Sequence, residues 1–389
     1  MKVLFVGNLG NTGYRFVRWL LEYGVDATLL LPENFNHPRS HPQWEEPSLE
    51  GHYPGWIKTF REYRFPYLFV NRKIRKMARR YDVILTAGFH VLPVLSLDKP
   101  VIFLPVGRDL TQMPFWSDTW INEMHSYLYR KRIHRVKRIL TDQEDCVWAG
   151  RLLGAGQRIH RFPFLVDVRQ IEQNINIPLK EDLEKKYGHY DCLFFNPTRK
   201  NMDARRMDYK GVDKLLVGFR RFLDRHKDLN VVMVSGLHGL HVDAFKQRIQ
   251  ELDLEDHMAY TGHLNLPDLH AWLSMGHVAV FDQFTQNLNA LSGIQREALA
   301  LGRPVVTSTD VNTPAFKQAY GPDCPLIPAF DAHDICRAME QLTGGPSRDS
   351  LWNATSIRKW TLKHVHYESR IQELINLLEQ TLSEFKEKR

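Results

Sequence analysis

The stretch Phe281-Asp-Gln-Phe-Thr-Gln-Asn-Leu-Asn-Ala-Leu-Ser-Gly-Ile-Gln-Arg-Glu297-Ala-Leu-Ala-Leu-Gly302-Arg-Pro304-Val-Val306 decides the fold. The apolar run 277–280 at its start predicts a strand, and a polar turn with Ser292 and Gly293 follows. After the turn we expect a helix that carries one acid, Glu297. Gly302 and Pro304 end that helix ahead of a second strand at 305–307.

A helix that follows a strand in this way is suited to binding an anion. Its first N–H groups lack hydrogen-bond partners, and its dipole is positive at that end. A single acid inside the same helix can accept hydrogen bonds from the hydroxyls of a sugar. The stretch therefore predicts a pocket for a nucleotide-diphosphate sugar.

Composition limits the class of protein. The chain has 389 residues, 43% apolar and 25% charged, which is typical of a globular protein of about two domains. Its four cysteines are scattered without a C-x-x-C pair, which argues for a reducing compartment and against a zinc site. The apolar run 1–7 is too short for a signal peptide, and no apolar run reaches the ~18 residues that span a bilayer. We expect a cytoplasmic protein, with peripheral contact at the inner face of the membrane left open.

The net charge of +7 is unevenly distributed. Residues 1–180 contain 26 Lys and Arg against 17 Asp and Glu, a net charge of +9. Residues 181–389 contain 26 against 28, a net charge of −2. We therefore expect an anionic partner for the first half and a small ligand for the second.

Strands and helices alternate through both halves of the chain. Continuous β-branched runs between helices favour parallel sheets covered on both faces. Strands are predicted at 3–6, 25–31, 83–86, 101–104 and 139–141, and again at 192–196, 231–234, 258–260, 278–281 and 305–307. The charged segment 168–188 is taken as a linker. The predicted domains are 1–180, 181–360 and a set of C-terminal helices at 361–389 that could pack back on the first domain. Two doubly wound domains would place ligands at the carboxyl ends of both sheets, in a cleft between them.

The loop Gly7-Asn-Leu-Gly10-Asn11-Thr-Gly13 follows the first strand and opens the first helix. Three glycines let the backbone approach a phosphate or sugar, although a tight turn without a ligand explains the spacing equally simply. A dinucleotide oxidoreductase also fits this spacing, with Tyr127 and Lys131 as its Y-x-x-x-K pair. Against it, the second predicted strand ends Leu-Pro-Glu33, a poor position for the acid that binds the adenine ribose, and that family needs no second doubly wound half.

Two basic residues flank the first strand-to-helix connection of the second half. Arg199 follows the strand 192–196, and Lys210 opens the next helix. A guanidinium fork and a point charge together suit a diphosphate. The strand before Arg199 and the strand before the helix of Glu297 belong to the same predicted sheet. The three residues could therefore share one ligand. A solvated basic loop, with Lys200, Arg205 and Arg206 nearby, is the simpler alternative.

The ordered set of motifs resembles the retaining family-4 (group 1) glycosyltransferases, whose fold is GT-B: two Rossmann-like α/β domains with parallel sheets facing across a cleft. In the first half, the family's Gly-rich loop falls at Gly7–Tyr14 and its "H-G-S-D" element at Gly107-Arg-Asp109-Leu. The family's interdomain turn falls at Pro163-Phe-Leu-Val-Asp167. In the second half the match is carried by Thr198-Arg199, Lys210-Gly211-Val-Asp213, Val232-Met-Val-Ser-Gly236, Tyr260-Thr-Gly262-His-Leu264 and Glu297-Ala-Leu-Ala-Leu-Gly302-Arg-Pro304.

The resemblance implies roles for the matched residues. Arg199, Lys210 and Asp109 would be catalytic, the first two by stabilising the departing nucleotide diphosphate. Glu297 would hold the ribose. The implied donor-binding residues are Gly10, Asn11, Leu264, Asn289, Ser292, Gly293 and Glu297. The family is typically metal-independent, and the chain has no D-x-D triplet, so Lys and Arg would supply the charge that a metal supplies elsewhere.

The chain departs from the family at two positions. The first acid of the usual E-x7-E pair is Asn289, which can hydrogen-bond a sugar but carries no charge. The common histidine before Gly107 is Val106. His90 could substitute, although a lone histidine at a strand end is more often structural.

A basic, aromatic segment, 56–80, accounts for much of the first half's charge. Interleaved aromatic and basic residues suit an anionic lipid surface, and a solvated helix face suits the pattern equally. Nucleic acid fits the charge as well, but no recognised nucleic-acid module is present, and none is expected to bind. The predicted membrane or acceptor surface consists of Trp56, Arg72, Lys73, Arg75, Lys76, Arg79 and Arg80.

The sequence therefore predicts a retaining hexosyltransferase-type enzyme without a cofactor. It would move a sugar from a UDP- or GDP-linked donor, bound by the second domain, to a hydroxyl of a glycan or lipid-linked acceptor on the first. Two alternatives stay open: a non-catalytic sugar-nucleotide-binding relative, suggested by Asn289 and Val106, and a GT-B sugar-nucleotide epimerase.

Overall fold

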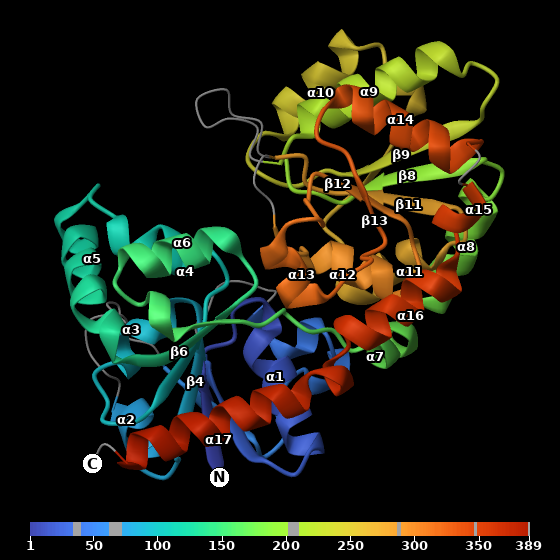
Figure 1. Cartoon of the computed structure of the whole chain (residues 1–389). Helices are drawn as coiled ribbons and strands as arrows, with labels where there is room; N and C mark the ends of the chain where they lie inside the picture. The colour runs from blue at the N-terminus through green and yellow to red at the C-terminus, as the bar shows by residue number, and fades with distance from the viewer. Residues whose placement is uncertain (34–39, 62–71, 201–209, 286–288, 346–347, 388–389) are drawn as a thin grey trace. The chain divides into compact units, whose positions relative to one another are not determined.

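The structure, a computed structural model, describes residues 1–33, 40–61, 72–200, 210–285, 289–345 and 348–387. The chain divides into two compact units (Figure 1). The first unit contains Met1–Phe164 and Arg370–Arg389, and the second contains Leu165–Ser369. The division lies before residue 180, the predicted boundary, because 168–188 packs on the core of the second unit.

The first unit is built on a seven-stranded sheet in the part of the chain that is described. Its strand order is β3-β2-β1-β4-β5-β6-β7, and every pairing is parallel. The strands are β1 (Lys2–Val6), β2 (Asp26–Pro32), β3 (Ile57–Phe60), β4 (Val83–Ala87), β5 (Val101–Leu104), β6 (Val136–Thr141) and β7 (Ile159–Arg161).

Helices cover both faces of this sheet because successive strand residues point to opposite sides. Leu4 and Val6 belong to the core on one face, while Phe5 packs its ring against Phe16 on the other. The helices are α1 (Thr12–Glu22), α2 (Arg72–Ala78), α3 (Val91–Val94), α4 (Arg108–Thr111), α5 (Trp120–Arg132) and α6 (Glu144–Leu152).

The C-terminal helix α17 (Ile371–Glu387) belongs to this first unit (Figure 1). It contacts α1 and β4 and buries Ile371, Leu374 and Leu378 completely. Arg138 on β6 also forms an ion pair with Glu384 on α17, which adds to the apolar contacts of this helix.

The second unit repeats the design with a six-stranded parallel sheet over its described residues. Its strand order is β10-β9-β8-β11-β12-β13. The strands are β8 (Cys192–Asn196), β9 (Val231–Gly236), β10 (Met258–Thr261), β11 (Val278–Phe281), β12 (Val305–Thr307) and β13 (Leu326–Pro328).

Alternation along these strands divides the second core into two layers. Phe194 faces the layer that contains α9, α10 and α14, and Phe195 faces the layer that contains α11, α12 and α16 (Figure 1). The helices are α7 (Val168–Gln173), α8 (Ile177–Tyr187), α9 (Val212–Arg225), α10 (Val242–Glu251), α11 (Leu266–Ser274), α12 (Gly293–Ala300), α13 (Pro314–Tyr320), α14 (Ala332–Thr343), α15 (Arg348–Leu351) and α16 (Ala354–His364).

Two sequence-based expectations differ from the structure. The segment 168–188, expected to be a linker, forms α7 and α8, because Asp167 and Asn176 cap their N-termini with side-chain oxygens. The segment 56–80, treated as one basic stretch, begins with the edge strand β3, in which Ile57 and Phe60 are buried. Its residues 62–71 lie outside the described part of the chain.

A search of the described residues finds no helix with the length and apolarity needed to cross a bilayer.

Candidate functional site

The two central strands of the second sheet, β8 and β11, lead into crossovers that run in opposite directions. β8 is followed by β9 on one side, and β11 by β12 on the other. In a doubly wound sheet, ligands bind outside the carboxyl ends of the strands at such a switch point. Thr198 and Arg199 follow β8 here, and Asp282 follows β11 directly.

Asp282 joins the two sides of this switch point. Its buried carboxylate accepts a hydrogen bond from Thr198 Oγ1 at 2.7 Å and another from Ser292 Oγ at 2.5 Å. Gln295 Nε2 lies 3.3 Å from the same carboxylate and donates to Thr307 Oγ1 at 3.0 Å. Asp282 therefore holds both Thr198, just after β8, and Ser292, the N-cap of α12.

Arg199 and Lys200 are adjacent but differ completely in environment. Arg199 is exposed and forms no hydrogen bond or ion pair with the residues that the structure describes. Lys200 is fully buried, donates to Asn196 Oδ1 at 2.6 Å and lies over the Phe245 ring. Lys200 therefore holds the end of β8, and of the two described cations that follow this strand, Arg199 is the one exposed to solvent.

The backbone of this loop is held from the other side by the β9–α10 connection. Lys200 N donates to His238 O at 2.8 Å, and His241 N donates to Lys200 O at 3.2 Å. Gly239, at φ +122°, lies so close that a Cβ would be 2.4 Å from Lys200 O. The two neighbours of Arg199 in the chain, Thr198 and Lys200, are thus both held by hydrogen bonds.

Lys210 lies just before α9, within electrostatic reach of Asp282 and Arg199. Burial lowers the pKa of Lys210, the charge of Asp282 opposes that shift, and the charge of Arg199 adds to it. Phe284 N donates to Lys210 O at 2.9 Å. The next residue, Gly211, has φ +67°, and a Cβ there would be 2.5 Å from Phe284 O. Only glycine fits this left-handed, crowded N-cap, which fixes the position of Lys210.

The helix α12 begins with a capping box. Ser292 Oγ accepts from Gln295 N at 3.2 Å, and Gln295 Oε1 accepts from Ser292 N at the same distance. Ser292 was predicted to bind the donor, but its N–H is already used in a hydrogen bond within the protein. Gly293 is exposed, and a Cβ there would meet nothing within 4 Å.

Glu297 lies one turn further along α12 and is 6% exposed. Its Oε2 is 3.9 Å from His270 Nε2 on α11, and His270 is itself buried. Leu264 packs partly against the apolar core next to this helix, and Asn289 is half-buried. The structure thus brings Arg199, Lys210 and the start of α12 to one edge of one sheet, with Glu297 deeper inside.

In the first unit, the predicted glycine-rich loop follows β1. Asn8 crosslinks it by donating to Asn11 Oδ1 at 2.7 Å and to Ser40 O at 2.8 Å, while its own Oδ1 accepts from Tyr14 N at 2.7 Å. The Asn11 amide also donates to His41 O, so this side chain is used inside the loop. Gly10 has φ +59° and borders open space.

Asp109 and His90 lie at the same edge of the first sheet. Asp109 is buried, and Val106 N donates to its two carboxylate oxygens at 3.0 and 3.1 Å. Burial raises the pKa of Asp109 to about 7, against backbone hydrogen bonds from Val106 and Gly88 that lower it. His90 is also buried and lies against Gly7, where a Cβ would be 2.4 Å from its Nδ1. Asp109 therefore ties together the loops that follow β4 and β5.

The six basic residues of the predicted membrane or acceptor surface are exposed on and after α2: Arg72, Lys73, Arg75, Lys76, Arg79 and Arg80. Trp56 is half-buried, and its ring stacks on Tyr14 at 5.6 Å. Membrane contact stays a prediction. Within the described ranges, no group of three His, Cys, Asp or Glu residues has the arrangement of a metal site.

Sequence reasoning missed the anchor residues of the site. Asp282 and Thr198 were quoted within motifs but received no role, because only their contact across the sheet reveals it. The Ser292–Gln295 capping box had a local signal, since Ser-x-x-Gln before an apolar run predicts a helix start. The approach of His270 to Glu297 had no signal, since the two residues lie on different helices.

Comparison with known proteins agrees with this architecture. Residues 202–344 match the family model described as glycosyl transferases group 1. No curated protein sequence matches the chain. Among solved structures, Anabaena HepE in complex with UDP-glucose is similar, with 14% identity and a TM-score of 0.67 over 98% of this chain and 100% of that one.

Two further structures are similar over nearly their full length. Sucrose-phosphate synthase from Thermosynechococcus elongatus has 12% identity and a TM-score of 0.68, covering 98% of this chain and 99% of that one. A Listeria monocytogenes protein described as a UDP-N-acetylglucosamine 2-epimerase has 13% identity and a TM-score of 0.54, covering 96% of each chain. The predicted fold is confirmed: the chain has two Rossmann-like units of GT-B architecture, and the segment that matches the group 1 glycosyl transferase model lies in the second.

Proposed function

We propose that this protein is a retaining glycosyltransferase that uses a nucleotide-diphosphate sugar. The second unit would bind the donor, UDP- or GDP-linked, and the first would bind a glycan or lipid-linked acceptor. The match of residues 202–344 to the group 1 family supports transfer of a sugar. The likeness to a protein solved with UDP-glucose makes that compound the first donor to test.

The observation that carries this proposal is the pair of cations at the switch point of the second sheet. Arg199 is exposed and Lys210 half-buried, and they are close enough for the charge of Arg199 to lower the pKa of Lys210. Two cations that lie close together repel each other, and a diphosphate bound between them would turn this repulsion into attraction. Both charges would stabilise the nucleotide diphosphate as the glycosidic bond breaks, without a metal ion.

The other predicted residues would act around this pair. Gly293 would offer its backbone to a phosphate or sugar at the start of α12, with Ser292 and Asn289 beside it. Glu297 would hold the ribose, with Leu264 near the base. For Asp109, its burial and backbone hydrogen bonds favour a role in positioning the loops that follow β4 and β5. Gly10 and Asn11 would contribute to donor binding from the loop after β1.

Calorimetric titration of UDP into R199A and K210A tests the donor site. Each substitution removes a charge-assisted contact, so we expect each to weaken binding by about 3 kcal/mol and to slow transfer from UDP-glucose. The control is R220A, because Arg220 is also a guanidinium of this unit but pairs with Asp224 on the surface of α9. Wild-type affinity and turnover in both site variants would refute the assignment.

The same preparation separates the alternatives. Incubation with UDP-sugars and no acceptor would yield an isomerised donor if the chain were an epimerase. Tight UDP binding without turnover on any acceptor pool would identify a non-catalytic relative. We expect the sugar to be transferred with its anomeric configuration retained. NMR of the product measures that configuration.

A further inference from the structure

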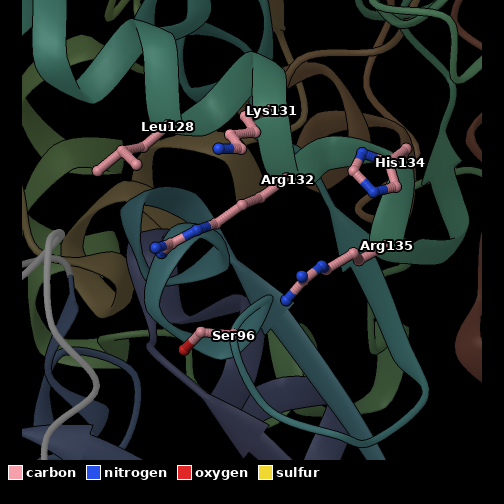
Figure 2. A pocket seen from close by; sticks show the side chains of 6 residues that line it. All are labelled: Ser96, Leu128, Lys131, Arg132, His134 and Arg135. Atoms are coloured by element: carbon pink, nitrogen blue, oxygen red, sulfur yellow. The ribbon is translucent and has the colours of Figure 1, made fainter.

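A basic pocket of about 480 Å³ lies in the first unit (Figure 2). Its lining residues are Ser96, Leu128, Lys131, Arg132, His134 and Arg135. Leu128, Lys131 and Arg132 belong to the end of α5. His134 and Arg135 form the short 3-10 turn η7 (Ile133–Arg135) that leads into β6.

The pocket is at the opposite end of the sheet from the predicted ligand edge. Arg135 immediately precedes the amino end of β6, and Ser96 lies in the connection that precedes β5. Gly7 and Asp109, in contrast, follow the carboxyl ends of β1 and β5. Since all strands are parallel, these are two different edges, and the pocket is separate from the loops that carry those residues.

The side chains of the pocket converge on one space. Figure 2 shows the amino group of Lys131 and the guanidinium groups of Arg132 and Arg135 ending around it, with the Ser96 hydroxyl on its far side. Ser96 donates to Pro93 O at 2.8 Å, so its oxygen is held in place. Lys131, Arg132 and Arg135 thus supply charged N–H donors to one cavity.

Among the residues that the structure describes, no carboxylate balances the positive charge of this pocket. Over the described ranges, Lys131, Arg132, His134 and Arg135 form no ion pair with a carboxylate. Arg135 donates one long hydrogen bond, 3.4 Å to Leu95 O, and Lys131 lies 5.7 Å from the centre of the Tyr127 ring. Cations gathered in this way repel one another, and an anion between them would reverse the sign of that energy.

A purely structural explanation accounts for part of this cluster. Basic residues in the last turn of a helix stabilise its negative dipole end, which explains Lys131 and Arg132. It does not explain His134 and Arg135, which lie beyond α5, or the hollow that all four line.

We propose that this pocket binds the phosphate group of a small anionic molecule. Two guanidinium forks match phosphate oxygens in geometry, and an ammonium group adds a third positive charge. The volume is that of a small-molecule site, and Leu128 supplies one apolar wall for a short organic part. This site is independent of the donor site on the second unit.

The test is calorimetric titration of inorganic pyrophosphate into the full chain. Because the donor site also attracts diphosphate, R199A/K210A serves as the parent protein. We expect it to retain pyrophosphate binding that weakens as salt rises. Adding R132Q/R135Q to this parent removes both forks, and we expect the affinity to fall at least about tenfold.

The matched control is R151Q/R221Q in the same parent, which removes two exposed arginines away from the pocket. An equal loss of affinity in the control and pocket variants would show a general charge effect and overturn the proposal, as would a parent that does not bind. Thermal unfolding checks that both variants are folded.

Phosphatidylcholine vesicles with and without phosphatidic acid distinguish the source of the phosphate. Pyrophosphate binding without retention on acidic vesicles identifies a soluble ligand. Retention that R132Q/R135Q abolishes and R151Q/R221Q preserves identifies a lipid headgroup in the same pocket.

Discussion

Arg199 and Lys200 show how much the role of a charged residue depends on its neighbours. The sequence contains two adjacent cations after a strand, and nothing local distinguishes them. The structure buries Lys200 against Asn196 and Phe245, and it leaves Arg199 exposed. Residue types were enough to predict a diphosphate site here, but which of the two cations faces solvent depends on contacts with Phe245 and with the β9–α10 connection.

Asp109 allows a prediction about pH at the same scale. Burial raises its pKa in the folded chain to about 7, while its usual value is 3.8. Between these values the folded state binds more protons than the unfolded state, so stability falls as pH rises from about 4 to about 7. A shift of one pKa unit corresponds to about 1.4 kcal/mol. The unfolding free energy should therefore fall by at most roughly 4 kcal/mol across this pH range.

D109N removes this titration. We expect the difference in unfolding free energy between wild type and D109N to decrease as pH rises from 4 to 7, and to stay level above 7. Urea denaturation across that range measures it, and D256N, an exposed aspartate on the second unit, is the control. A difference that is constant with pH would contradict the burial argument.

At the scale of elements, the central strands were predictable because their apolar runs are continuous. The edge strands β3, β7 and β13 were not predicted. β3 buries only its end residues, Ile57 and Phe60, within a basic segment. β7 has three half-buried residues without an apolar run, and β13 is only three residues long. The helices α7 and α8 were missed for a related reason: their stability comes from caps and from packing on the second core rather than from a strong apolar stripe.

The start of α9 gives an element-scale prediction. We expect G211A to destabilise the chain by roughly 1–3 kcal/mol, because alanine is strained at φ +67° and its Cβ would be 2.5 Å from Phe284 O. Lys210 would shift with the helix start, so UDP affinity should fall as well. The matched substitution G293A, at the start of α12, meets nothing within 4 Å and should leave stability within about 0.5 kcal/mol.

Urea denaturation and UDP titration of both variants measure these effects. If G211A and G293A proved equally stable, the left-handed cap of α9 would not be what fixes Lys210.

At the scale of the whole molecule, the sequence predicted two doubly wound halves, since β-branched runs alternate with helices throughout. The placement of the division was harder, because no composition change marks Phe164. Surface charge alone also could not reveal the pocket at the amino edge of the first sheet. Its residues come from a helix end, a 3-10 turn and a separate loop that only the fold brings together.

The C-terminal helix leads to a prediction that links the two ends of the chain. Leu378 is fully buried on α17, and α17 contacts α1 and β4. We expect L378A to cost about 2–5 kcal/mol and to speed hydrogen exchange in β4 and α1. The neighbouring exposed residue supplies the control, E379A, which should change neither. Unchanged exchange in β4 would show that α17 does not support the first sheet.

The discontinuity of the first unit also has a consequence during synthesis. Residues up to Phe164 leave the ribosome first, but the helix that covers α1 and β4 is made only after all of Leu165–Ser369. At typical translation rates this interval is roughly 10–40 s. During it the nascent first sheet has an uncovered apolar strip, so the second unit can complete its folding before the first. A chaperone that binds nascent chains should therefore associate with the segment up to Phe164 until α17 has been synthesised.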